Sequence, residues 1–372
     1  MNLLHVGLYV SLMLSLLTGL SIVVLSLVWI ERKFIGRIQM RLGPMHVGPY
    51  GLLQPVADAI KLVAKEDLLS PWVDRAVYWI APLAVFVPSF MIWVTIPISR
   101  DVVIRNMEMG LFYIVAFSVL SIVGLVAAGW ASSNKYAVLG GFRAAAQLIS
   151  YEIPLIMSVL GVAMLSQSLN LQSIVESQGT IVNALVQPLG LLIFFTAGLA
   201  EIGRTPFDIH PAESEVVGGP FVEYSGAHWS IFFLAEYINT FAVAALTVLL
   251  FLGGWLIPGL SGDITTLSIL VFFIKTYFVV LIIFWFRGTY PRLRIDQLMS
   301  FGWKVLVPLS FLNIIITAFY LFYGWPTWVL IIISFAIVIT VFWLISKRMN
   351  NTKQEYTVSL YVPPTPEVSN AR

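Results

Sequence analysis

Glu201-Ile-Gly-Arg-Thr-Pro-Phe-Asp-Ile-His-Pro-Ala-Glu-Ser-Glu215 is an acidic segment between two long apolar runs, 188–200 and 229–256. Positions 201–236 hold six of the chain's 19 acidic residues: Glu201, Asp208, Glu213, Glu215, Glu223 and Glu236. Carboxylates beside membrane spans are costly to keep ionised, so they require partners, water or a function in moving protons. A solvated acidic loop is the alternative interpretation. We disfavour it because Glu201 and Glu236 fall on the apolar sides of the loop boundaries.

The composition of the chain is that of a membrane protein. Hydrophobic residues make up 59% of the 372 positions and charged residues 11%, against about 25% charged in ordinary soluble domains. A soluble fold of this length has no room to bury so much apolar surface. The net charge of +2 is too small to indicate binding to nucleic acid. We therefore predict an all-α polytopic membrane protein.

Residue types that hold metals and redox cofactors are scarce. The chain has no cysteine, which excludes disulfides, thiolate metal sites and cysteine-held iron–sulfur clusters. Its four histidines do not pair at helical spacing, and neither a G-x-G-x-x-G turn nor a P-loop is present. We therefore expect no metal, haem, flavin or iron–sulfur cluster to be bound by this chain.

Apolar runs of spanning length predict about nine transmembrane helices. The first covers 5–30, and it is too long and lacks the basic leader of a signal peptide. The other predicted spans are 76–98, 111–131, 151–166, 186–203, 229–257, 267–286, 304–323 and 325–346. The polar tail 347–372 is predicted to be disordered, so 1–346 forms the integral membrane domain.

The distribution of basic residues predicts the orientation of these spans. With the N-terminus outside, the inner segments hold 18 of the 21 Lys and Arg residues. The outer loops then hold only Arg100 and Arg105, and Lys275 falls within a span. The positive-inside rule therefore places the N-terminus outside and the acidic loop on the cytoplasmic, or equivalent, face.

The first inner loop predicts a helix that lies in the membrane interface. Segment 54–66 alternates so that two helical faces differ in polarity. The two faces carry Asp58, Lys61 and Lys65, and Val56, Ile60 and Val63. Three glycines and two prolines in 43–51 predict a tight non-helical segment before it. A plain tether is the alternative, but a tether would not need the charged cluster that begins at Glu31.

Four inner loops carry sequence motifs in a fixed order, across about 31–304. The first loop holds Glu31-Arg-Lys33, Arg41-Leu-Gly-Pro44 and Gly48-Pro-Tyr-Gly-Leu-Leu-Gln-Pro-Val-Ala-Asp-Ala-Ile-Lys61. The later loops hold Gly129-Trp-Ala-Ser-Ser-Asn-Lys-Tyr-Ala137, Arg143-Ala-Ala-Ala-Gln-Leu-Ile-Ser-Tyr-Glu-Ile-Pro154, Ala200-Glu-Ile-Gly-Arg-Thr-Pro-Phe-Asp208, Ala212-Glu-Ser-Glu215, Glu223-Tyr-Ser-Gly226 and Tyr290-Pro-Arg-Leu-Arg-Ile-Asp-Gln-Leu-Met299. Together they resemble the H-type membrane subunits of NADH:quinone oxidoreductase, the respiratory complex I. In that enzyme, the H-type component docks to the peripheral arm.

This resemblance implies a role at a quinone site. In the family, the cytoplasmic loops close one end of a narrow quinone chamber, and membrane spans of the same protein frame its entrance from the bilayer. The candidates to line the chamber are Arg32, Gln39, Arg41, Asp58, Lys61, Arg204 and Arg287. Docking to a soluble partner protein and to lipid headgroups is the alternative for each of them. The quinone itself is a substrate (ubiquinone, menaquinone or plastoquinone), and its head is held by a neighbouring subunit in this family.

The resemblance also assigns the six acids of 201–236, together with Glu152, to a charged path from the chamber into the membrane arm. Negative charge on a reduced quinone raises the pKa of nearby buried carboxylates, which titrate as a coupled set. An N-terminal helix cap is the alternative for Glu152. Lys275 lies about 12 Å into its span at 1.5 Å per residue, too deep for easy snorkelling. We predict that it belongs to the path and pairs with Glu236 or Glu201.

The sequence departs from the family at two places. His210-Pro211 stands where many relatives have a Pro-Glu pair, so one acid is absent, and Gly203 stands where asparagine is usual. His210 titrates near neutrality and is a weak candidate to replace the missing carboxylate.

Three functions remain open from the sequence. The first is a subunit of a proton-pumping oxidoreductase in a bacterial plasma membrane, or in a thylakoid or mitochondrial inner membrane. Its expected partners are the peripheral-arm quinone-site and iron–sulfur subunits, other membrane-arm subunits including antiporter-like ones, and lipid. The second is the homologous component of a membrane-bound hydrogenase or another donor-linked relative. The third is a stand-alone ion transporter, against which the elaborate cytoplasmic loops argue.

Overall fold

The computed structural model describes residues 3–209, 213–256 and 265–355, and within these ranges it contains helices and turns but no strand. The elements before the acidic loop are α1 (Leu3–Ile38), η1 (Pro49–Gly51), α2 (Gln54–Ala64), α3 (Arg75–Met91), η2 (Ile92–Val94), α4 (Gly110–Ala131), α5 (Lys135–Ser166), α6 (Leu171–Ser177), α7 (Asn183–Val186) and α8 (Pro188–Ile202). Those that follow are α9 (Glu213–Val216), η3 (Gly219–Phe221), α10 (Gly226–Phe251), α11 (Thr265–Thr289), α12 (Ile295–Phe301), the π-helical turn η4 (Gly302–Leu306), α13 (Val307–Tyr323) and α14 (Thr327–Glu355).

The prediction of an all-α polytopic membrane protein is confirmed. In the described part of the chain, eight helices are long and apolar enough to cross a membrane. The predicted fifth span corresponds to α8, which is apolar but only 15 residues long. The nine predicted runs are therefore eight long helices and one short one. α14 continues to Glu355, and residues 356–372 of the predicted tail lie outside the described residues.

The predicted fourth span differs most from the observed helix. α5 begins at Lys135 rather than at 151, and the side chain of Asn134 caps it by accepting a hydrogen bond from the Tyr136 N–H at 3.0 Å. Its first turns interrupt the apolar pattern with residues such as Arg143 and Gln147, so hydropathy alone missed them. Glu152 consequently lies in the middle of a helix. The alternative interpretation of Glu152 as an N-terminal cap is wrong.

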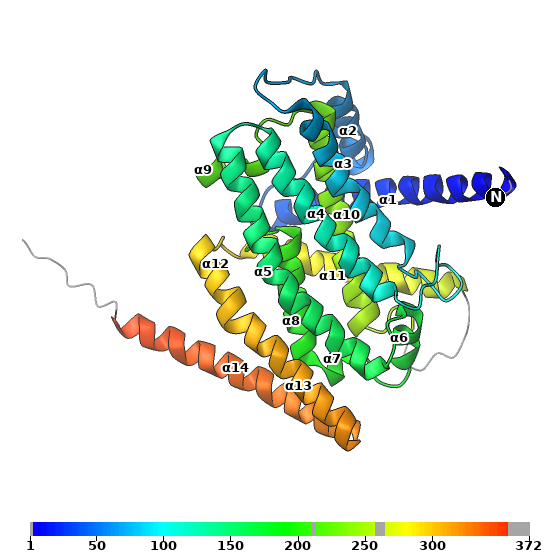
Figure 1. Ribbon diagram of the computed structural model, residues 1–372, viewed down its shortest axis with the longest axis vertical. Helices are drawn as coiled ribbons and strands as arrows, with labels where there is room; N and C mark the ends of the chain where they lie inside the picture. Colours follow the sequence, from blue (N-terminus) through cyan, green and yellow to red (C-terminus); the bar gives the residue numbers. More distant parts are fainter. Residues whose placement is uncertain (1–2, 210–212, 257–264, 356–372) are drawn as a thin grey trace, which may run out of the picture.

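The long helices form an inclined bundle with α10 at its centre. Helices α3, α4, α5 and α10 lie side by side, whereas α1 passes beside α11 and its N-terminal part projects beyond the other helices (Figure 1). Every residue from Thr240 to Phe251 of α10 is buried. A helix that is apolar on all sides is typical of such a central position. By contrast, α14 is largely exposed at the edge of the bundle.

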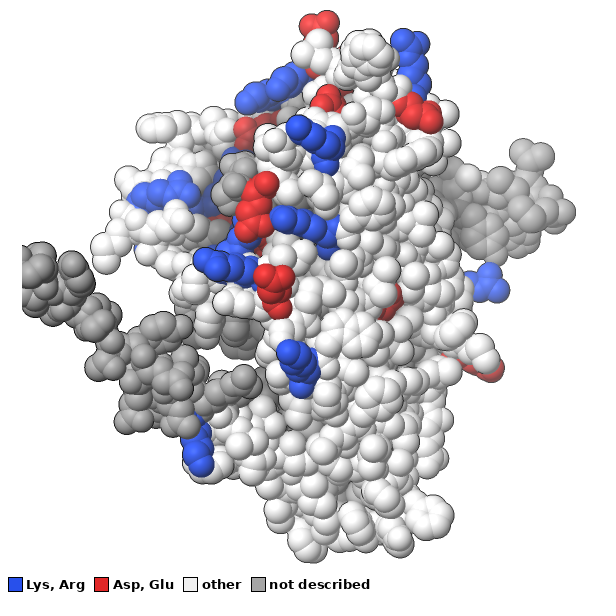
Figure 2. Space-filling model, turned by 60° about the vertical axis from the view of Figure 1, so that its left-hand side comes forward, with Lys and Arg blue, Asp and Glu red and all other residues white. Residues whose placement is uncertain are grey.

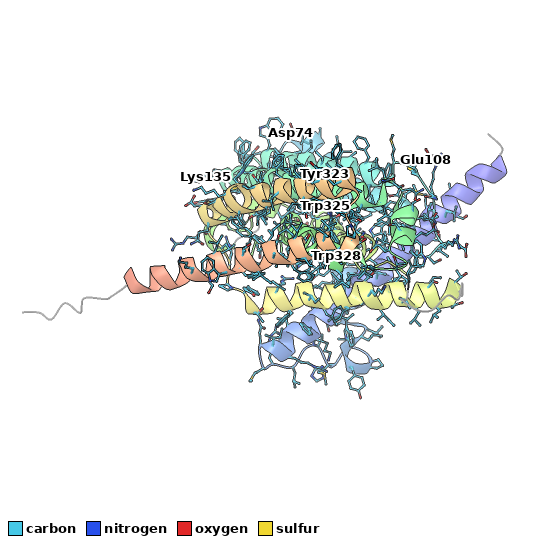
Figure 3. The ribbon with its side chains drawn as sticks, turned by 90° about the horizontal axis from the view of Figure 1, so that it is seen from below. Asp74, Glu108, Lys135, Tyr323, Trp325 and Trp328 are labelled. Atoms are coloured by element: carbon cyan, nitrogen blue, oxygen red, sulfur yellow. The ribbon has the colours of Figure 1, made fainter. Side chains whose placement is uncertain are left out.

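The two ends of the bundle differ in character. We call the end that carries α2, α9, η3 and α12 the charged end. Figure 2 shows Lys, Arg, Asp and Glu side chains gathered on the upper and left parts of one face, above a nearly uncharged lower part. At the opposite end, Tyr323, Trp325 and Trp328 lie together at the turn between α13 and α14 (Figure 3). Such aromatic clusters are typical of a membrane–water interface.

The predicted interfacial helix is present as α2. Its apolar side chains Val56, Ile60 and Val63 are all exposed in the isolated chain. On the opposite face, Asp58 forms an ion pair with Arg32 at the end of α1. This ion pair holds α2 beside α1. The apolar face of α2 is left free for lipid or for another protein.

Gly51 is expected to be essential for the turn between α1 and α2. It has φ +76°, and a Cβ at this position would meet the Pro44 carbonyl oxygen at 2.2 Å. We expect Gly51→Ala to cost at least about 1–3 kcal/mol from backbone strain alone and to reduce the thermal stability of the protein. Gly19→Ala is the control, because a Cβ at Gly19 meets nothing within 4 Å. Equal thermal stability of the two variants would contradict the expectation.

Candidate functional site

A buried ion cluster joins four elements at the charged end. Glu31, near the end of α1, is only 5% exposed. Its carboxylate accepts a hydrogen bond from the Tyr237 hydroxyl at 2.7 Å and forms an ion pair with Arg287 of α11. Arg204, in the segment after α8, approaches the same carboxylate at 3.8 Å. A buried carboxylate needs such partners, because an unpaired buried charge is strongly destabilising.

Arg204 links this cluster to a second carboxylate. Its Nε lies 3.2 Å from Glu236 of α10, and its guanidinium lies over the Tyr237 ring at 4.5 Å from the centroid. Gly203, with φ +70°, ends α8 in the left-handed conformation and turns Arg204 inward. Burial acts to lower the pKa of Arg204, but the carboxylates of Glu236 and Glu31 outweigh it and the pKa is raised. Arg204 is therefore a permanent cation between two acids.

Glu236 also faces an internal cavity, which we call the acidic cavity. This space of about 90 Å³ lies between α3, α4, α5, α8 and α10. Its walls are mostly apolar, with polar groups supplied by Ser89, Ser118, Ser121, Glu201, Glu236 and Asn239. One water requires roughly 10–15 Å³ of such space and two to four polar partners. The acidic cavity therefore has room for a short chain of waters between the two carboxylates.

Glu152 adjoins the acidic cavity. Its carboxylate accepts a hydrogen bond from the Ser118 hydroxyl at 3.4 Å, and Ser118 is part of the cavity wall. Glu201 lines the same cavity. The structure thus brings Glu152, Glu201 and Glu236 together around one space, although they come from three helices.

Two other acids of the predicted path, Glu215 and Glu223, lie nearer the surface of the charged end. Glu215 is held by Arg143 at 2.7 Å and by Arg292 at 3.6 Å. Glu223 accepts a hydrogen bond from the Asn134 side chain at 2.9 Å.

Two further acids and the predicted substitute histidine lie in the same segment. Asp208 is half-buried in the segment after α8. Glu213 begins α9, but its side chain and the His210-Pro211 pair lie outside the described part of the chain.

The predicted quinone-chamber residues fall into two groups. Arg204 and Arg287 meet at Glu31, and Arg32 meets Asp58 at the base of α2. The other three are exposed on the charged end: Gln39, Arg41 and Lys61. Of these, Arg41 donates a hydrogen bond to the Gln39 side chain at 2.7 Å. Of the first group, only Arg204 and Arg287 surround a buried carboxylate, whereas Arg32 is exposed and Asp58 is half-buried.

Lys275 does not pair with an acid of the path. Its ammonium donates hydrogen bonds to the backbone carbonyls of Leu252, Gly254 and Leu256, at 2.8, 3.0 and 2.8 Å. The predicted pairing with Glu236 or Glu201 is therefore wrong. These carbonyls belong to the C-cap residue of α10 and to the segment that follows it, so the ammonium satisfies backbone groups that lie outside the helix.

Sequence reasoning missed Glu31 and Tyr237 as site residues. Glu31 is the first charge after a long apolar run, and Arg32 follows it directly. Tyr237 follows Glu236 and gives no signal of its own, since tyrosine is common in membrane helices. The signal for Glu31 was its position on the apolar side of the cluster, the same signal that identified Glu201 and Glu236.

Comparisons with known proteins agree with the resemblance seen in the loops. A model of the NADH dehydrogenase family matches residues 11–318. The chain is 52% identical over 289 residues to the H-type membrane component of NADH-quinone oxidoreductase from Geobacillus kaustophilus, covering 77% of this chain and 86% of the relative. It is 50% identical over 305 residues to the same component from Anoxybacillus flavithermus, covering 81% and 91%. For the counterpart from Dehalococcoides mccartyi the identity is 46% over 307 residues, covering 82% and 85%. The chain therefore belongs to the NADH dehydrogenase family, the family that includes these H-type components of NADH-quinone oxidoreductase.

Proposed function

We propose that this chain forms the membrane side of the quinone site in a proton-pumping NADH-quinone oxidoreductase and starts the transfer of protons into the membrane arm. One observation supports this most strongly. The buried cluster of Glu31, Arg204 and Arg287 is joined through Glu236 to the acidic cavity. The ion cluster is thus in direct contact with the acidic cavity.

The quinone substrate is expected to interact with the cations of this cluster. Reduction of a quinone by two electrons to the quinol takes up two protons, and its carbonyl oxygens gain negative charge before they are protonated. Guanidinium groups that are already fixed by Glu31 stabilise such charge without reorganisation. Arg287 is half-buried and Arg204 is fully buried, so Arg287 is the more accessible of the two. A neighbouring subunit would hold the quinone head, and this chain would shape the chamber from Arg32, Gln39, Arg41, Asp58, Lys61, Arg204 and Arg287.

Proton transfer would begin at Glu236. Negative charge near a carboxylate favours its protonated form, and interacting carboxylates titrate as one set. Glu236 contacts Arg204 and lines the acidic cavity with Glu201, and Glu152 is hydrogen-bonded to Ser118 of the cavity wall. Glu213, Glu215, Glu223 and Asp208 would supply protons from the charged end. Lys275, which caps α10, stays a proposed member of the path through its charge alone.

The assembly follows from the same topology. With the N-terminus outside, the charged end faces the cytoplasm and would contact the peripheral-arm quinone-site and iron–sulfur subunits. The exposed faces of α1, α2 and α14 would contact lipid and other membrane-arm subunits, including antiporter-like ones. The relatives come from bacteria, which supports a location in the plasma membrane.

The relatives' name favours a quinone acceptor over the hydrogenase alternative. Copurification separates both from a stand-alone transporter, because a transporter would purify alone or as a homo-oligomer. Donor-dependent quinone reduction in isolated membranes separates the first two.

A photoreactive quinone analogue tests the proposed chamber. The intact complex would be illuminated with an azido-quinone, and the labelled peptides of this chain would be mapped by mass spectrometry. We expect labels within 31–41, 54–64, around Arg204 or around Arg287, suppressed by excess quinone. Labels confined to the opposite end, or insensitive to competing quinone, would refute the chamber.

Arg287→Ala should raise the apparent quinone KM by about 10-fold, the effect of losing roughly 1.4 kcal/mol of binding, with little change in assembly. The reason is that Arg287 is the accessible cation of the cluster. Quinone reduction by the purified complex at varied quinone concentration measures it. Arg37→Ala is the control, since Arg37 is an exposed cation at the same end. Unchanged quinone kinetics in Arg287→Ala would place this residue among the docking residues instead.

A further inference from the structure

Two hollows meet at the base of α10. One is the acidic cavity. The other is a half-open groove of about 320 Å³ at the charged end, which we call the surface groove. Its wall includes Val217, Val222, Tyr224, Trp229 and Phe233. Three residues line both hollows: Phe221, Phe232 and Glu236.

The two phenylalanines lie at the boundary between these hollows. Their ring centroids are 4.8 Å apart, and the Tyr224 ring contacts Phe232 edge-on at 5.0 Å. Phe232 is 4% exposed. A constriction between apolar rings excludes water, and a proton cannot cross a gap in a chain of hydrogen bonds. Glu236 is the carboxylate among the three residues that line both hollows. A proton that passes between the hollows therefore passes next to Glu236 and the two rings.

The two rings are held differently. Phe232 lies in the second turn of α10 and cannot move without that helix. Phe221 ends η3, which begins at the last of three successive residues with positive φ: Val217 at 61°, Gly218 at 122° and Gly219 at 62°. Positive φ is an outlier for a β-branched residue such as valine, and such strain persists only when the surroundings enforce it. Phe221 is therefore the ring whose position depends on a strained segment.

Close packing against α5 holds that segment in place. A Cβ on Gly140 would meet the Gly219 Cα at 2.4 Å, so the two backbones touch. The same loop carries Glu223, which is fixed to Asn134 at the start of α5. The segment that positions Phe221 is therefore tied to α5 at both Gly140 and Asn134.

We propose that Phe221 and Phe232 form a hydrophobic barrier between the surface groove and the acidic cavity, and that movement of η3 opens it. This inference rests on the proposed function. The barrier would keep protons in the acidic cavity from exchanging freely with solvent. Phe221 and Phe232 exclude water in this role and touch no substrate. The barrier is narrow, because one pair of rings forms it.

Cysteine labelling tests the barrier directly. The chain has no cysteine, so one introduced thiol is the only thiol in this chain. Ser89 lines the acidic cavity and is 1% exposed, and Ser89→Cys is nearly isosteric. The intact purified complex would be treated with methyl methanethiosulfonate, and modification of this chain would be followed by mass spectrometry. We expect Phe221→Ala to accelerate modification of the Ser89→Cys variant at least about tenfold, because one side of the constriction is removed.

Two variants serve as controls. Phe233→Ala removes a ring that lines the surface groove but not the acidic cavity, and it should leave the labelling rate unchanged. Phe221→Leu keeps an apolar side chain and should give an intermediate rate even if Phe221→Ala assembles poorly. An unchanged rate in both Phe221 variants, or equal acceleration by Phe233→Ala, would overturn the barrier.

Proton pumping separates the barrier from the proposed function. In proteoliposomes, Phe221→Ala should lower the number of protons pumped per NADH while quinone reduction continues. Faster labelling with unchanged pumping would support the barrier and refute the cavity as a proton carrier. Slow labelling in Phe221→Ala, with pumping lost in Glu201→Gln, would refute the barrier and keep the proposed function.

Discussion

Glu201→Gln is expected to lower quinone reduction and proton translocation together, by on the order of 100-fold, the contribution typical of a positioned proton-transfer group, in a complex that still assembles. Glu201 lines the acidic cavity at the end of α8. Glutamine preserves its shape and its capacity to hydrogen-bond water, but an amide does not take up and release a proton. Both activities should fall because reduction of the quinone cannot finish while its protons are not delivered.

The measurement combines NADH-driven quinone reduction with acidification of proteoliposomes that contain the purified complex. Glu176→Gln is the matched control, because Glu176 lies in α6 at the opposite end, half-exposed and 3.4 Å from Arg100. It should behave as the wild type. Normal turnover with normal pumping in Glu201→Gln would remove this residue from the route. Normal quinone reduction with lost pumping would show that the two processes are not obligatorily linked at Glu201.

Two acids of the site, Glu201 and Glu236, could be singled out from the sequence because each is locally anomalous. Glu201 and Glu236 are charges on the apolar sides of loop boundaries, a pattern that a single sequence displays. Which charged side chains of the site contact one another was not predictable from the sequence. The ion pair between Glu31 and Arg287 joins positions 256 apart, and the cavity that joins Glu201 to Glu236 depends on how five helices are inclined to one another.

Two errors have a common physical cause. The first turns of α5 were predicted as loop, and Lys275 was paired with a carboxylate. Both inferences considered side chains and neglected backbone hydrogen bonding. In a membrane, a helix that carries polar residues can be stabilised by packing, as Gln147 shows by donating hydrogen bonds to the carbonyls of Ala200 and Phe207, each at 2.7 Å. The ammonium of Lys275 likewise finds carbonyls that no charge pattern reveals.

Arg204→Met is expected to cause the largest loss of stability. Arg204 is 4% exposed, and two carboxylates and the Tyr237 ring surround it. Removing one partner of a buried ion pair costs about 3–5 kcal/mol, because the remaining charge stays buried and uncompensated. The cost on the Glu236 side is smaller, since that side chain is 36% exposed and water screens it. Thermal inactivation of the purified complex should therefore begin at a lower temperature, or the chain should fail to assemble.

A double variant shows whether the loss arises from the orphaned charge or from lost packing. Arg204→Met with Glu236→Gln removes the cation together with one of its two carboxylates. If uncompensated charge is the cause, this double variant should be more stable than Arg204→Met alone, although inactive in pumping. Arg204→Lys should remain intermediate, because an ammonium keeps the charge but neither lies flat over Tyr237 nor reaches both carboxylates with a planar fork. Arg100→Met, at an exposed ion pair of the opposite end, should leave the inactivation temperature unchanged. Equal instability of the single and double variants would mean that Arg204 acts by filling space, and its link between the Glu31 cluster and the acidic cavity would then carry no electrostatic signal.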